Sequence, residues 1–104
     1  MAGLAKLSNK QIAQRLAKLK GWRRKRNAIT KEFVLKSFTG ATRFLSKIAP
    51  VANAMDHHPD AELYKYKRVK ISLTTHSAGG ITRNDFALAA KIDKLAPTSE
   101  SGKT

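Results

Sequence analysis

The chain has 104 residues, enough for one domain and too few for two, and 41% of them are hydrophobic, so it can bury a core. It contains no cysteine, which excludes disulfides, thiolate metal sites and cysteine nucleophiles. Its 21 Lys and Arg against 7 Asp and Glu give a net charge of +14, which favours solubility and attraction to polyanions.

The first 20 residues are basic, amphipathic and free of acids. This composition resembles a transit peptide, but we interpret the segment as the first helix of the domain. No stretch approaches the roughly 20 apolar residues of a membrane span, and we expect no membrane association. We expect a cytoplasmic protein, with organellar import as the alternative. One domain is predicted over residues 1–97, followed by a disordered tail over 98–104.

A capping box at Ser8 and Gln11 predicts the start of the first helix. Its apolar stripe consists of Ile12, Leu16 and Leu19. We expect the helix to end at Gly21, because glycine readily takes the left-handed conformation of a helix C-terminus.

Residues 22–37 alternate in hydrophobicity as a pair of strands does, with Ile29, Phe33 and Leu35 on one face. A turn at Arg26–Asn27 would make them a hairpin. Residues 23–26 form an unbroken basic run, which we interpret as a solvated face. Contact with nucleic acid is the alternative and is not favoured.

The second helix is predicted to begin at Thr39 and to be kinked by Pro50, which cannot donate a backbone hydrogen bond. It should end near Asp56, because His58 precedes Pro59 and is thereby biased towards extended geometry. Its predicted buried face consists of Phe44, Ile48, Val51, Ala52 and Met55.

Residues 62–75 predict a second strand pair, with a turn around Tyr66–Lys67 and an apolar face of Val69, Ile71 and Leu73. Thr82 and Asp85 form the capping box of a last helix that ends at Pro97. The fold class is therefore α+β in the order α-β-β-α-β-β-α: a four-stranded antiparallel sheet with three helices on one face. The other face is expected to be half-apolar, which favours self-association.

Three histidines, His57, His58 and His76, are the candidates for chemistry. Imidazole both accepts and donates protons near neutrality, so two of them could promote elimination or addition of water. Asp56 and Asp85 are the carboxylates best placed to orient an imidazole. A zinc site is the rival interpretation, but adjacent His57 and His58 should point in different directions, and we predict no metal.

These residues resemble the signature of the pterin-4a-carbinolamine dehydratase family. Asp56-His57-His58-Pro59 is followed by Tyr66, by His76 after nine intervening residues, and by Asp85 after eight more. The similarity covers about Ser8 to Ala96. Some members of that family also act as dimerisation cofactors of a homeodomain transcription factor.

The resemblance implies a dehydratase that eliminates water from 4a-hydroxytetrahydropterin, giving a quinonoid dihydropterin for tetrahydropterin recycling. It implies His57 and His76 as the acid–base pair and His58 as a pterin-binding residue that completes the catalytic set. The implied substrate-binding residues are Asn53, Asp56, His58, Thr75 and Asp85. No metal or organic cofactor is implied, and a homodimer or homotetramer is.

Two positions depart from the family pattern. Asn53 stands where an ionisable residue is usual, and Asn84 replaces the arginine usually found before the aspartate corresponding to Asp85. A non-catalytic module of the same fold, binding a partner protein or nucleic acid through its basic surface, is therefore the alternative function.

Overall fold

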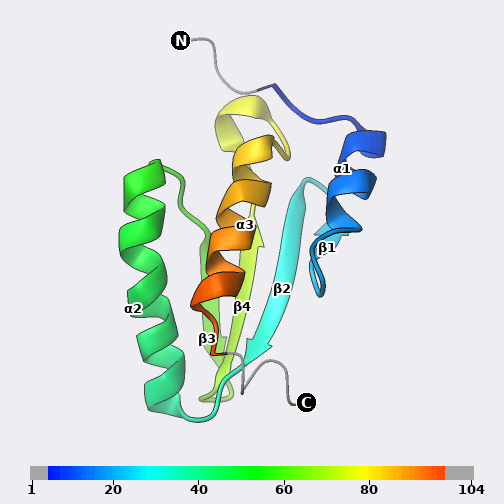
Figure 1. Cartoon of the computed structure of the whole chain (residues 1–104). Helices are drawn as coiled ribbons and strands as arrows, with labels where there is room; N and C mark the ends of the chain where they lie inside the picture. The colour runs from blue at the N-terminus through cyan, green and yellow to red at the C-terminus, as the bar shows by residue number, and fades with distance from the viewer. Residues whose placement is uncertain (1–4, 98–104) are drawn as a thin grey trace.

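The computed structural model describes residues 5–97 and has the predicted α-β-β-α-β-β-α order (Figure 1). Its four strands form one antiparallel sheet in the order β1-β2-β4-β3. All three helices cover the same face of this sheet, which confirms the predicted fold class. The elements are α1 (Asn9–Leu16), β1 (Arg23–Lys25), β2 (Ala28–Val34), α2 (Phe38–Met55), β3 (Asp60–Tyr64), β4 (Arg68–Leu73), the 3₁₀ helix η1 (His76–Ala78) and α3 (Arg83–Leu95).

The central strands β2 and β4 form the floor of the core. Alternate side chains on each strand point at the helices and are almost completely buried: Ile29, Phe33, Val69, Ile71 and Leu73. Each such side chain stabilises the fold by about 1.5–3 kcal/mol through burial. Helix α2 adds Phe44, whose ring centroid lies 4.8 Å from that of Phe33. The predicted strand pattern is confirmed here.

The helix-free face of the sheet is polar, so the expectation of a half-apolar face is wrong. Cross-strand register aligns its side chains in four rows: Lys25–Ala28, Arg23–Thr30–Ser72–Asp60, Glu32–Lys70–Glu62 and Val34–Arg68–Tyr64. Ala28 and Val34 are the aliphatic residues among them. Self-association through an apolar sheet face therefore loses its support, and the oligomer itself stays a prediction.

Helix α1 begins as predicted, with both hydrogen bonds of the Ser8–Gln11 capping box. It ends at Leu16, not at Gly21, and tighter turns replace the expected last helical turn. The cause is distant in sequence: buried Trp22 donates its indole N–H to the Asp93 carboxylate at 3.0 Å. The chain leaves the helix axis early to insert this ring beneath α3. Gly21 still takes a left-handed conformation, with φ of +85°.

Helix α2 is capped by Ser37, not by the predicted Thr39. The Ser37 hydroxyl accepts a hydrogen bond of 2.9 Å from the backbone N–H of Gly40. Pro50 lies inside the helix, and Asp56 ends it, both as predicted. The predicted tail at 98–104 lies outside the described residues. Among residues 5–97, no helix combines the length and apolar character that crossing a membrane requires.

The β3–β4 hairpin begins earlier than predicted. Strand β3 starts at Asp60 instead of residue 62. The turn joins Tyr64 to Arg68 through Lys65, Tyr66 and Lys67, and so contains the predicted Tyr66–Lys67. Lys65 and Tyr66 both have positive φ, a conformation that Gly and Asn take most readily. The absence of both residue types explains why this turn has only a weak signal in the sequence.

Candidate functional site

The candidate site begins where α2 unwinds. Asp56 takes the left-handed conformation, with φ of 51° and ψ of 42°, and so turns the chain back across the end of the helix. The backbone N–H of His57 then donates to the Ala52 carbonyl at 3.0 Å. This geometry directs the His57 imidazole away from solvent, and only 9% of the residue is exposed.

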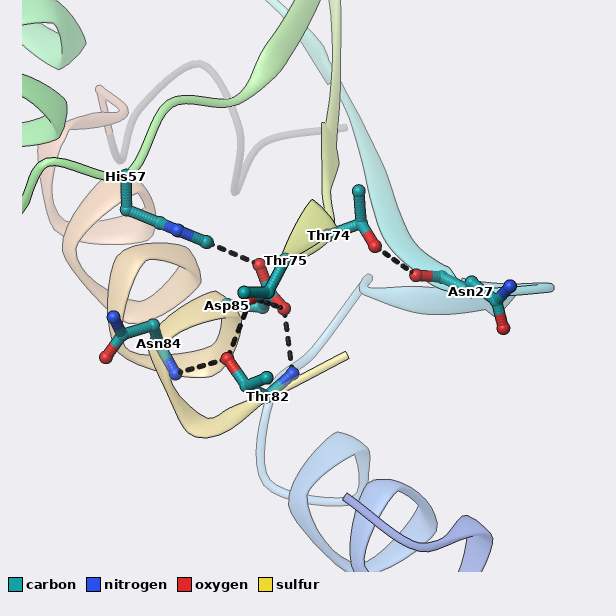
Figure 2. Close-up of polar contacts among 7 residues, drawn as sticks. All are labelled: Asn27, His57, Thr74, Thr75, Thr82, Asn84 and Asp85. Carbon is teal, nitrogen blue, oxygen red and sulfur yellow. Dashed lines mark hydrogen bonds and ion pairs between the residues drawn. The ribbon is translucent and has the colours of Figure 1, made fainter. Parts of the chain in front are cut away.

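The buried His57 ring contacts the first turn of α3. Its Nε2 atom lies 2.6 Å from Oδ1 of Asp85, a carboxylate with no exposed surface (Figure 2). The Thr75 hydroxyl donates to Oδ2 of Asp85 at 2.9 Å, and the backbone N–H of Thr82 donates to the same oxygen at 2.9 Å. Three hydrogen bonds therefore converge on Asp85, as a buried carboxylate requires.

The donors and acceptors of this network have a definite order. The N–H of Asn84 donates to the Thr82 hydroxyl oxygen at 3.3 Å. Because the Thr75 proton is used on Asp85, the Thr82 hydroxyl must donate its own proton to Thr75 Oγ1, 2.8 Å away. Every proton thus points towards Asp85.

An ionised Asp85 would set the tautomer of His57. A carboxylate only accepts hydrogen bonds, so Nε2 of His57 would carry the proton directed at Asp85. Nδ1 is then the nitrogen with a free lone pair when the ring is neutral. Among residues 5–97, no buried side-chain nitrogen or oxygen lacks a hydrogen-bond partner, so the network is complete.

His58 points elsewhere, as expected for adjacent residues at the end of a helix. Its Nε2 lies 2.9 Å from the side-chain oxygen of Asn53, one turn earlier in α2, and both residues are exposed. The departure from the family pattern at Asn53 therefore places a neutral amide beside His58, not beside His57. Asp56, between these two groups, is also exposed.

His76 lies in η1 directly after Thr75, so its main chain is one residue from the Asp85 network. The residue is exposed and lines a surface pocket of about 390 Å³ together with Arg26, Asn27 and Thr74. A hydrogen bond of 2.5 Å from the Thr74 hydroxyl to the Asn27 carbonyl holds the β1–β2 turn against this segment (Figure 2).

The structure thus joins three of the predicted residues directly: His57, Thr75 and Asp85. His58 and Asn53 form a second pair, and His76 lies beside the first group in sequence. Thr82 was predicted only as a helix cap, and Arg26 and Asn27 were not predicted as pocket residues. The capping box was a local signal for Thr82, whereas nothing local connects the β1–β2 turn with residues 74–76, almost 50 positions later.

No metal site emerges from this arrangement: across the part of the chain that the structure describes, no three His, Asp or Glu side chains come together as a metal-binding group. Buried His57 has a carboxylate partner instead. The chemistry available at the site is proton transfer by imidazoles: His57 is buried and oriented, and His58 and His76 are exposed.

The chain is similar to known proteins over most of its length. A sequence model of the family described as "Pterin 4 alpha carbinolamine dehydratase" matches residues 5–95. A protein of Sulfurisphaera tokodaii named "Putative pterin-4-alpha-carbinolamine dehydratase" is 49% identical over 92 residues, 88% of this chain and 98% of that relative. A protein of the same name from Roseiflexus sp. is 46% identical over 90 residues, 86% of this chain and 96% of its own.

Two solved structures share the fold. A transcriptional coactivator/pterin dehydratase from Brucella melitensis has a TM-score of 0.84 and 34% identity, covering 88% of this chain and 99% of its own. A pterin dehydratase-like protein described as a RuBisCO assembly factor in the alpha-carboxysome has a TM-score of 0.58 and 25% identity, covering 72% and 86%. With the match to residues 5–95, these similarities show that the chain belongs to the pterin-4a-carbinolamine dehydratase family.

Proposed function

We propose that the protein is a hydro-lyase that removes water from 4a-hydroxytetrahydropterin and releases a quinonoid dihydropterin. The observation that carries this proposal is the buried network in which Asp85 lies 2.6 Å from Nε2 of His57 and so orients its ring. Family membership supplies the substrate class. A fixed imidazole next to the segment that carries a second one suits a reaction that needs both a proton acceptor and a proton donor.

In the proposed reaction, Nδ1 of His57 accepts the proton of a ring N–H of the substrate. The electron pair of that bond forms a new carbon–nitrogen double bond at C4a, and the C4a–oxygen bond breaks. A protonated His76 donates to the departing hydroxyl, which leaves as water. One proton has then moved from His76 to His57, and exchange with solvent restores both residues.

The remaining residues have binding roles in this proposal. His58, held by Asn53, and the exposed Asp56 contact the polar edge of the pterin. Thr75 and Asp85 act through His57, because their side chains are occupied within the buried network. No cofactor takes part, and we expect the active protein to be a homodimer or homotetramer.

The test is turnover of 4a-hydroxytetrahydropterin by His57→Gln and His76→Ala variants, measured against the spontaneous reaction. Glutamine can still donate a hydrogen bond to Asp85, so His57→Gln preserves the buried carboxylate's partner while removing the proton acceptor. We expect each variant to lose roughly 10²–10⁴-fold in turnover. Ser77→Ala, at the exposed neighbour of His76, is the control and should retain activity. Near wild-type rates in both histidine variants would overturn the proposal.

The similarity to a RuBisCO assembly factor favours one alternative, a non-catalytic assembly module of the same fold. The neutral Asn53 at a position that is usually ionisable supports it too. The same assay separates the two functions, since an assembly module would leave the spontaneous rate unchanged.

A further inference from the structure

Basic residues gather at the end of the molecule formed by α1 and the β1–β2 hairpin. The first acidic residue of the chain is Glu32, whereas residues 5–31 contain ten Lys and Arg. Nine of these ten are exposed, and we call them the basic surface: Lys6, Lys10, Arg15, Lys18, Lys20, Arg23, Arg24, Lys25 and Arg26. The tenth, Lys31, is half-buried and paired with Asp93 at 2.9 Å.

The two parts of this surface, α1 and the β1–β2 hairpin, meet at the edge of the sheet, where Arg24 lies on the helix-covered face of β1 and Arg23 and Lys25 on the helix-free face. Helix α1 lies beside β1 (Figure 1), and the Arg24 guanidinium donates to the Asn9 side-chain oxygen at 2.7 Å. Arg24 also donates to the Arg26 carbonyl at 2.8 Å, which stiffens the turn. Within residues 5–97, none of the nine cations forms an ion pair with an acid.

The groove between α1 and α3 extends this surface with amide and aromatic groups. It has a volume of about 500 Å³, and its lining includes Gln11, Gln14, Arg15 and Phe86. The Arg15 guanidinium lies 5.9 Å from the centre of the Phe86 ring. Guanidinium and amide donors are the groups that proteins use most often on phosphate oxygens and base edges.

From these observations we infer that the basic surface binds the phosphodiester backbone of a nucleic acid. A membrane surface fits less well, because peripheral binding requires apolar side chains that insert between lipids. Among residues 5–97, the large hydrophobic side chains that are exposed are Phe38 and Tyr66. They belong to the start of α2 and to the β3–β4 turn, at the other end of the molecule from α1. The basic surface meets the candidate site at Arg26, which lines the same pocket as His76, whereas Arg23 and Lys25 lie outside that pocket.

The experiment compares two double variants of the full chain that lose the same charge. Arg23→Gln/Lys25→Gln removes two cations from the basic surface, and Arg43→Gln/Lys47→Gln removes two exposed cations from α2. Binding to a fluorescent 25-mer, as duplex and as single strand, is measured by anisotropy between about 0.05 and 0.2 M salt. Vesicles containing anionic phospholipid serve as the membrane arm.

We expect the wild type to bind duplex, single strand or both, with affinity that falls steeply with salt. The Arg23/Lys25 variant should bind roughly tenfold more weakly at 0.1 M salt, with a log–log salt slope flatter by about 2, since each lost phosphate contact removes roughly one unit. The Arg43/Lys47 variant should keep the wild-type slope. Equal losses in both variants, no binding at low salt, or binding to vesicles alone would each overturn the inference.

Discussion

Asp85→Asn is the sharpest test of how the buried network serves the site. Asparagine has the shape of aspartate but one acceptor oxygen in place of two. The donors of Thr75 and Thr82 both require an acceptor at the position of Oδ2, so the amide oxygen should occupy it. The amide NH₂ then faces Nε2 of His57 across 2.6 Å. Two donors cannot share that contact, so His57 must place its proton on Nδ1 and accept at Nε2.

The magnitude follows from this change of tautomer. The lone pair proposed to accept the substrate proton moves from Nδ1 to the buried side of the ring, so we expect turnover to fall roughly 10²–10⁴-fold. The fold should survive, because all three contacts are replaced by neutral hydrogen bonds. We expect a loss of about 1–3 kcal/mol in the free energy of unfolding. For a domain of this size, that is about 4–8 °C in Tm per kcal/mol.

The assay is dehydration above the spontaneous rate, read together with ¹⁵N chemical shifts of the imidazoles, which report the tautomer directly. Asp93→Asn is the matched control, because Asp93 is the acceptor for Trp22 and Lys31 away from the histidines. It should lower Tm and leave turnover within about threefold. An Asp85→Asn variant that kept its activity with His57 still protonated on Nε2 would refute the reasoning.

Three further outcomes are expected. Phe44→Ala, which leaves a cavity beside Phe33, should lower the free energy of unfolding by about 3–5 kcal/mol in a denaturant titration. A loss below about 1 kcal/mol would show that the core is loosely packed. Ser37→Ala should lower the free energy of unfolding by about 1 kcal/mol, and Thr39→Ala by clearly less, because Ser37 is the N-cap of α2. A larger loss for Thr39→Ala in thermal unfolding would contradict this. The hydrogen bond from the Tyr64 hydroxyl lowers the pKa of Glu32 below its ordinary 4.5, so the stability that Glu32 contributes is present above pH 4.5 and is lost as pH falls through the lowered pKa. The wild type should therefore have a higher free energy of unfolding than Glu32→Gln near neutrality, and the two values should converge in acid. A difference that widens in acid would contradict this.

The elements of this fold could be predicted from the sequence because their signals are local. Both capping boxes, at Ser8 and Thr82, are confirmed, and the period-2 pattern of β2 and β4 identified the strands. The end of α1 could not be predicted, since it is set by the contact of Trp22 with Asp93, 71 residues away. The polar sheet face follows from the same alternation, since Thr30, Glu32, Lys70 and Ser72 occupy the positions between the buried residues; the expectation of a half-apolar face gave them too little weight.

The site was predictable as a set of residues but not as an arrangement. Spacing and family resemblance indicated His57, Thr75 and Asp85, and the structure joins them. The pairing of His57 with Asp85 spans 28 residues and depends on the left-handed conformation of Asp56. That conformation is usually marked in a sequence by glycine, and here the residue is aspartate. The second role of Thr82, in the buried hydrogen-bond network, could not be predicted for a different reason: it involves the same threonine and aspartate as the capping box.

His57 is hydrogen-bonded through both its main chain and its ring, and this limits how the surrounding core can be redesigned. Its main chain is bonded to the last turn of α2 through Ala52, and its ring to the first turn of α3 through Asp85. A relative displacement of these helices by about 0.5 Å would disturb that short contact. Repacking the apolar layer between α2 and α3 should therefore change the rate of the proposed dehydration whenever it changes thermal stability. Stabilising substitutions on the polar face of the sheet would leave the contact between His57 and Asp85 undisturbed.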